Sequence, residues 1–131
     1  MPEKQKQYKD LAKAGLDEKL PEISWFTNLH KNYTITIVIP EYTSVCPKSG
    51  NPDFGKITIQ YQPKERIIEL KSLKEYIFSY RNLGIFYENA VNRILKDIVS
   101  SIKPIWISVK GEFTPRGGIC SIVESRWPVK K

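Results

Sequence analysis

One loop in the first half of the chain places a thiol and a carboxylate where they could react together. Residues 41–54 read EYTSVCPKSGNPDF, with Cys46 and Asp53 seven positions apart on a segment that two prolines stiffen. A thiol attacks only as its thiolate, and a nearby base can take its proton without a histidine. Because two negative charges repel, we expect the pair to share one proton. The alternative is a small buried cysteine and an aspartate that caps a turn.

The segments around this loop predict the elements that position it. Residues 33–39 alternate apolar and polar side chains, as a half-buried strand does, and Pro40 is expected to end that strand. Residues 57–62 alternate in the same way. Two helices are predicted next, at about 72–80 and about 86–102, the second with an apolar stripe at helical spacing.

Two more strands complete the pattern, one at 105–113 and one that runs to about Arg126 after a glycine-rich turn. The order ββααββ predicts an α+β domain whose antiparallel sheet carries both helices on one face. We expect ordered structure to begin near Asn32, with a single domain over 26–131 and a charged arm or short helix over 1–25.

The composition limits the classes of protein and site. The chain has 131 residues and a formal charge of +7, which favours anionic partners such as phosphates. Its basic residues are dispersed, so specific phosphate sites are favoured over a general RNA surface. No apolar run approaches the ~18 residues of a membrane span, and the first residues lack a signal core, so we expect a cytoplasmic protein. Cys46 and Cys120 are expected to be thiols, and with His30 as the only histidine we expect no metal site.

Four segments carry a family resemblance. They read CPKSGNPDF at 46–54, ELKSLKEY at 69–76, FSYRNLGIFYEN at 78–89 and GEFTPRGG at 111–118. Through them the chain resembles the NADPH-dependent 7-cyano-7-deazaguanine reductases of queuosine biosynthesis, the QueF family, in its unimodular form. The resemblance covers about residues 33–126. It implies the tunnelling fold, in which subunits assemble into rings, as pentamers or stacked decamers, with active sites between subunits.

The resemblance also assigns roles to residues. Cys46 would add to the nitrile of the substrate and Asp53 would move the proton. Substrate binding would fall to Ser72, Tyr87 and Glu88, and NADPH binding to Glu69, Lys71, Lys74, Arg116 and Gly117. Each has a plainer alternative, since lysines at a helix start are commonly solvated, a first-turn glutamate favours the helix dipole, and an arginine in a glycine-rich turn is ordinary.

Two positions depart from the family pattern. Glu75 puts a carboxylate close to the expected cofactor phosphates. Tyr87 stands where family members commonly have histidine, and a phenol does not take up a proton near neutral pH. Any proton transfer assigned to that histidine is therefore in doubt for this chain.

The implied reaction is attack of Cys46 on the nitrile to give a thioimide, followed by two reductions by NADPH to 7-aminomethyl-7-deazaguanine. A rival is the amidinotransferase of archaeosine synthesis, which adds ammonia to the same base on tRNA; it needs no hydride donor, so the segment 69–76 argues against it. A zinc-dependent cyclohydrolase of the same fold would need more Cys and His ligands. A basic RNA-binding module would use exposed aromatics such as Trp25, Trp106 and Trp127.

Overall fold

The computed structural model describes residues 11–129. Its elements are β1 (Trp25–Thr27), β2 (Ile35–Val45), β3 (Pro52–Gln62), β4 (Arg66–Ile68), α2 (Leu70–Phe78), a 3-10 helix (Ser79–Asn82), α3 (Tyr87–Ile102), β5 (Trp106–Phe113) and β6 (Ile122–Trp127). No helix among the described residues is long and apolar enough to span a bilayer.

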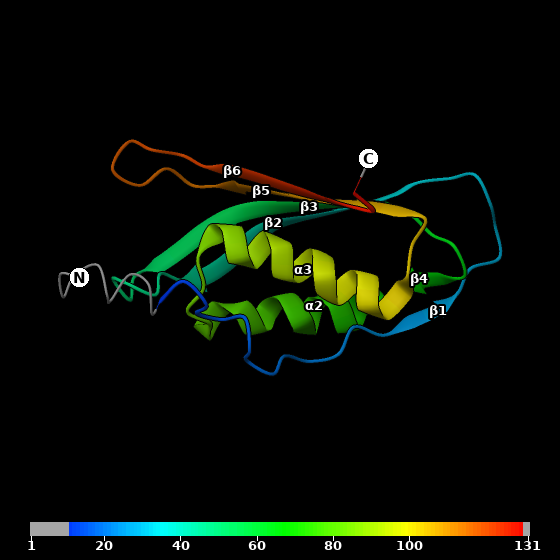
Figure 1. Ribbon diagram of the computed structural model, residues 1–131, viewed down its shortest axis with the longest axis horizontal. Helices are drawn as coiled ribbons and strands as arrows, with labels where there is room; N and C mark the ends of the chain where they lie inside the picture. The colour runs from blue at the N-terminus through cyan, green and yellow to red at the C-terminus, as the bar shows by residue number, and fades with distance from the viewer. Residues whose placement is uncertain (1–10, 130–131) are drawn as a thin grey trace.

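The main sheet has the strand order β2-β3-β5-β6, with every neighbouring pair antiparallel. Both helices lie on one of its faces (Figure 1). This confirms the predicted α+β class and the order ββααββ. The strands β1 and β4 form a separate two-stranded sheet, so the expected start of ordered structure near Asn32 was wrong. Strands of three residues are too short to show an alternating pattern.

A bulge divides β2 into two halves. The register runs from Ile39 opposite Ile57 to Tyr42 opposite Gly55, so two residues of β2 face a single residue of β3. Pro40 lies in this bulge and does not end the strand as predicted, because a proline is tolerated at a bulge on an edge strand. The extra residue changes which side chains face the helices. After the bulge, Tyr42 and Ser44 point inward and are fully buried.

The core lies between the sheet and the apolar stripe of α3, whose buried residues are Ala90, Val91, Ile94, Leu95, Ile98 and Ile102. Gly111 of β5 leaves room for this contact, since a Cβ there would lie 2.8 Å from Val91 Cγ2 and 2.7 Å from Phe113 Cζ. Phe113 therefore packs against Gly111, toward the end of the sheet where β2 meets the nucleophile loop.

The segment 11–24 crosses the helices on their outer side (Figure 1). The Arg93 guanidinium of α3 donates hydrogen bonds to the carbonyl groups of Gly15 and Glu18, and Ser101 donates to the carbonyl group of Ile23 at 2.6 Å. These bonds attach the segment along the length of α3. Residues 1–10 of the expected arm lie outside the described residues, and the boundary at residue 25 stays a prediction.

Candidate active site

Cys46 directly follows β2 and begins a tight turn. Its N–H donates to the Asn51 carbonyl at 2.9 Å, and its carbonyl accepts from the Gly50 N–H at 2.9 Å. Gly50 has a positive φ of 73°, which a residue without Cβ adopts at little cost. The turn leaves the thiol partly buried, and its Sγ is not sealed in the core.

This turn stabilises a thiolate. Burial alone raises the pKa of the Cys46 thiol, but hydrogen bonds from the Ser49 hydroxyl and from the backbone N–H groups of Ser49 and Lys48 lower it below its ordinary value of 9.0. The charge of Asp53 acts in the opposite direction and raises it, so thiol and carboxylate are close enough to interact. An N–H-lined turn that favours a negative sulfur is a recognised way to activate cysteine.

Asp53 is buried, with 4% of its surface exposed, and is fixed by two donors. The Tyr87 hydroxyl donates to its Oδ1 at 3.0 Å, and Arg116 Nη1 forms an ion pair with the same oxygen. Burial and the hydrogen bond to Asp53 raise the pKa of Tyr87. The hydrogen bond and charge of Asp53, with a smaller contribution from Cys46, raise the pKa of Arg116. The four side chains therefore form one electrostatic cluster.

Aromatic packing holds the cluster in place. Tyr87 lies at the start of α3, and its ring stacks on Phe113 with centroids 3.9 Å apart and an interplanar angle of 8°. Arg116 begins a two-residue turn in which Gly117 and Gly118 both have positive φ, closed by hydrogen bonds in both directions between Arg116 and Ile119. The helix α3 and the hairpin thus each bring one side chain to the same oxygen of Asp53.

The predicted cofactor segment lies at the start of α2, toward the other end of the sheet (Figure 1). Glu69 is the N-cap of α2, and its two carboxylate oxygens accept from the N–H groups of Lys71 at 2.7 Å and Ser72 at 2.9 Å. These bonds lower the pKa of Glu69. The buried Ser72 hydroxyl accepts from the Ser24 N–H and donates to the Glu69 carbonyl, both at 2.8 Å. Both residues thus have structural partners within the chain.

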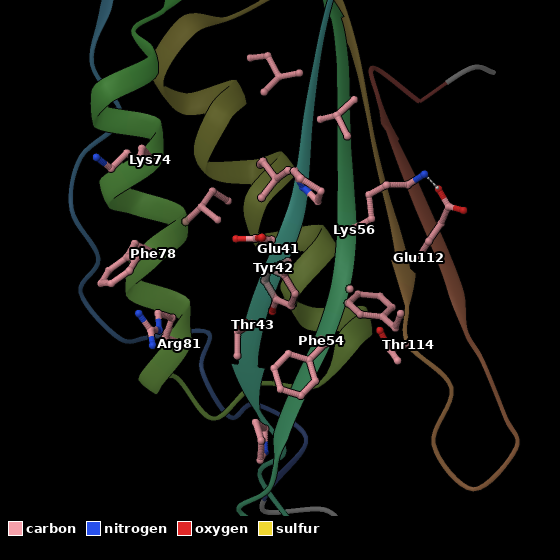
Figure 2. A pocket seen from close by; sticks show the side chains of 18 of the residues that line it. Glu41, Tyr42, Thr43, Phe54, Lys56, Lys74, Phe78, Arg81, Glu112 and Thr114 are labelled. Atoms are coloured by element: carbon pink, nitrogen blue, oxygen red, sulfur yellow. Dashed lines mark ion pairs between the residues drawn. The ribbon is translucent and has the colours of Figure 1, made fainter.

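A groove of about 1350 Å³ is lined by α2, the edge strand β2 and part of β3. Figure 2 shows Lys74 and Phe78 on α2 and Arg81 on the 3-10 helix that follows it, across from the edge strand β2, and the groove continues over the outward side of β3. Lys74 and Arg81 supply positive charge on the helix side. On the sheet side Lys56 is paired with Glu112 at 3.5 Å. None of Cys46, Asp53, Tyr87 and Arg116 lines the groove, and the two neighbours of Asp53 that do line it, Pro52 and Phe54, point to the other face of the sheet.

The remaining predicted residues are exposed. Glu88 follows Tyr87 in the first turn of α3, and Gly117 lies at the hairpin tip. Lys71 is exposed and is not among the residues that line the groove. Cys120 is exposed and lines the groove beside β6. The structure therefore gathers Cys46, Asp53, Tyr87 and Arg116, with Glu88 and Gly117 nearby, and leaves Glu69, Lys71, Ser72 and Lys74 at α2 and its N-cap.

Sequence reasoning missed three polar residues near the cluster. Ser49 lowers the pKa of Cys46 through hydrogen bonds within the turn. The Ser-Gly pair that begins three residues after the cysteine could have indicated such a turn. Ser44 and Tyr42 face Asp53 from β2, but only because of the bulge, which nothing in the alternation of 33–39 predicts.

The chain is similar to proteins of one family. The model of the family described as "QueF-like protein" matches residues 52–130. NADPH-dependent 7-cyano-7-deazaguanine reductase of Elusimicrobium minutum is 51% identical over 93% of this chain and 93% of its own length. The protein of the same name from Chlorobium chlorochromatii is 54% identical over 80% of this chain and 92% of its own.

The fold is also similar to that of a solved structure. The apo archaeosine synthase QueF-Like superposes with a TM-score of 0.69 over 74% of this chain and 95% of that chain, at 20% identity. At this identity the likeness bears on the fold alone, and it supports the fold class expected for this chain.

Proposed function

Since the chain belongs to the QueF family, we infer that it is an NADPH-dependent reductase that converts the nitrile of 7-cyano-7-deazaguanine to an aminomethyl group. The observation that carries this inference is the thiol of Cys46, with its lowered pKa, beside a buried carboxylate that two donors hold in place. That pair supplies what addition to a nitrile requires, a nucleophile and a group that moves its proton.

The proposed first step uses the chain's own residues. The sulfur of Cys46 bonds to the nitrile carbon, one π pair of the C≡N bond moves to nitrogen, and the thiol proton passes through Asp53 to that nitrogen. The product is a thioimide on Cys46. Tyr87 and Arg116 keep the carboxyl group of Asp53 in position for this transfer, because both bind its Oδ1.

Substrate binding is proposed for the exposed side chains around this pair. Glu88 carries a carboxylate at the open start of α3, one residue after Tyr87, and can accept two hydrogen bonds from the guanine-like edge. Ser72 is a weaker candidate for substrate binding than the sequence indicated, because its hydroxyl already has two hydrogen-bond partners within the chain.

The donor set of the groove fits NADPH. Lys74 and Arg81 face it with positive charge, which suits phosphate groups, and we propose that they hold the cofactor together with Lys71. Each NADPH would supply one hydride when bound, so that two equivalents used in succession would reduce one nitrile to an amine. Arg116 is bonded to Asp53, and its role toward the cofactor stays a proposal, as do those of Glu69 and Gly117.

A ring assembly is part of the same proposal. The outer edges of β2 and β6 have no strand partner among the residues that the structure describes, and exposed apolar side chains such as Val38, Phe54 and Phe78 lie near the first of these edges. Pairing of β2 with β6 of the next subunit would continue the sheet around a ring. A neighbouring subunit could then supply residues to the groove. We also propose the cytoplasm as the site of action.

The test is consumption of NADPH, followed by loss of its absorbance band, with 7-cyano-7-deazaguanine as the free base. We expect two equivalents per nitrile for the wild type and for Cys120→Ala. Cys46→Ala should lose turnover by at least ~10³-fold, because it lacks the nucleophile. Ammonia-dependent amidine formation without NADPH loss would favour the archaeosine-type reaction instead.

A further inference from the structure

The first part of the segment 11–24 packs against the loop that leads into α3. A Cβ at Gly15 would lie 2.7 Å from the carbonyl oxygen of Gly84 and 2.6 Å from Cβ of Ile85, and Ile85 is fully buried. Gly15 also has a positive φ of 82°, a conformation that favours glycine. The backbone and the close contact therefore both require a residue without a side chain at this position.

Two side chains of α3 hold the segment in this place. The Asn89 amide group donates to the Ala12 carbonyl at 2.8 Å. The Arg93 guanidinium donates to the carbonyl groups of Gly15 and Glu18. Both side chains belong to the first two turns of the helix. The segment 12–18 is thus fixed at the end of α3 through which the chain enters the helix (Figure 1).

The loop 83–86 beneath this segment is bonded to the strand that carries the nucleophile. The Val45 N–H donates to the Leu83 carbonyl, and the Ile85 N–H donates to the Val45 carbonyl, both at 3.0 Å. Cys46 directly follows Val45 in the chain. One side of the loop therefore supports the segment 12–18 and another side holds the backbone next to the reactive sulfur.

The same loop leads directly into the side chains at the start of α3. Phe86 is the N-cap of the helix, and it is followed by Tyr87, which is bonded to Asp53, and by Glu88, the proposed partner of the guanine-like edge. The loop therefore joins the nucleophile to the proposed substrate-binding residue. Its position sets the distance between the sulfur of Cys46 and a base held by Glu88.

We propose that Gly15 and Asn89 are positioning residues of the active site, because they fix the segment 12–18 against the loop 83–86 and so set the distance between Cys46 and a substrate bound at the start of α3. This proposal rests on the proposed function, in which the sulfur adds to a nitrile carbon. Such an addition requires reacting atoms about 3–3.5 Å apart, so a loop that has lost this support slows it.

Gly15→Ala tests the proposal directly. Carbon atoms in contact lie about 3.5–4.0 Å apart, so a Cβ placed 2.6 Å from Cβ of Ile85 displaces the segment or the loop by roughly 1 Å. A misplacement of that size lowers a rate by up to about 10²-fold.

The measurement is adduct formation without NADPH, with excess 7-cyano-7-deazaguanine and mass spectrometry of the product on Cys46. We expect the maximal rate of Gly15→Ala to fall between about tenfold and 10²-fold. The half-saturating concentration of the base should stay at the wild-type value, because Glu88 keeps its own contacts with the base.

Asn89→Ala and Ser101→Ala form a matched pair that decides the question even where Gly15→Ala does not fold. Each removes one hydrogen bond from α3 to a carbonyl of the same segment, the first to Ala12 at 2.8 Å and the second to Ile23 at 2.6 Å. Both should lower Tm. Only Asn89→Ala should slow adduct formation, by severalfold, because only its bond lies beside the loop 83–86.

Alkylation of Cys46 by iodoacetamide separates positioning from loss of structure. The hydrogen bonds that lower the pKa of Cys46 come from Ser49 and Lys48, within its own turn. In a Cys120→Ala background, Gly15→Ala and Asn89→Ala should therefore keep the parent's rate of alkylation at each pH. The distance to the substrate changes in these variants, and the turn does not.

The outcomes are distinguishable. A wild-type protein that forms no adduct overturns the proposed function, and this proposal with it. A folded Gly15→Ala protein that forms the adduct at the wild-type rate overturns the positioning role alone. An equal loss of rate in Asn89→Ala and Ser101→Ala also overturns it, as does a changed alkylation profile, because the rate would then follow the stability of the fold.

Discussion

At the scale of single residues, the reactivity of the cluster depends on the hydrogen bonds that one turn gives to the sulfur of Cys46. The residue types of Cys46 and Asp53 and their spacing could be read from the sequence, and so could a reason for them to act together. Their surroundings could not. Tyr87 and Arg116 come from segments 34 and 63 positions away from Asp53, and sequence spacing does not show which distant donors meet at one carboxylate oxygen.

Ser49→Ala should move the reactivity of Cys46 to higher pH. The pKa of Cys46 lies below 9.0 because hydrogen bonds from Ser49 and Lys48 outweigh the effect of burial, and the alanine variant loses the hydroxyl bond. The measurement is the rate of alkylation by iodoacetamide against pH, in a Cys120→Ala background so that a single thiol reacts. The variant should react more slowly near neutral pH and at the parent's rate well above pH 9.0.

Identical alkylation profiles for Ser49→Ala and its parent would contradict this reading of the turn. Because the Ser49 hydroxyl also accepts from the Asn51 N–H at 3.2 Å, Tm of the variant should be measured beside it. A Tm close to the parent's shows that the turn is still formed.

At the scale of elements, the main strands and both helices could be predicted because each is long enough to repeat its pattern. The apolar stripe of α3 and the alternation in β3 are clear examples. The strands β1 and β4 could not be predicted, because each has only three residues. The bulge at Pro40 could not be predicted either, because it shifts the alternation of β2 by one residue. The inward position of Ser44 follows from that break and was missed with it.

Glu69 is expected to stabilise α2 as its N-cap. As N-cap of α2 its carboxylate binds two backbone N–H groups, which lower its pKa below the ordinary 4.5. A lowered folded-state pKa stabilises the protein above pH 4.5, and this contribution disappears as the pH falls through the folded-state value. Glu69→Ala should therefore lower Tm by roughly a few degrees at pH 7.

The difference in Tm between Glu69→Ala and the wild type should shrink toward zero as the pH is lowered below 4.5. Thermal unfolding of the two proteins across that range is the measurement. Lys71→Ala is the matched control, since its exposed side chain makes no cap and its removal should leave Tm nearly unchanged. A constant difference at every pH would show that the carboxylate charge is not what stabilises α2.

At the scale of the whole molecule, the chain has a groove whose sheet side is an open edge. Phe78 is 60% exposed on the helix side of this groove, a position suited to burial against a neighbouring subunit. Phe78→Lys should lower the sedimentation mass toward the 15.2 kDa of one chain. NADPH turnover should fall with it, because the active site is proposed to lie between subunits.

Leu29→Lys is the control for Phe78→Lys. Leu29 is 82% exposed and takes no part in the groove, so this variant should keep both the assembly and the turnover of the wild type. A wild-type protein that sediments as a monomer while turning over NADPH would exclude the ring.

The bulge in β2 has a consequence for protein engineering. Before the bulge the odd-numbered side chains of β2 face the helices, and after it the even-numbered ones do. The nucleophile loop follows the second half of the strand. Deleting either Pro40 or Glu41 would leave one residue of β2 opposite Lys56 and keep Tyr42 opposite Gly55, so the later side chains of the strand would keep their faces in a regular hairpin. A graft of this loop onto a regular hairpin scaffold therefore has to keep the pairing of Ser44 with Asp53 and can omit the extra residue.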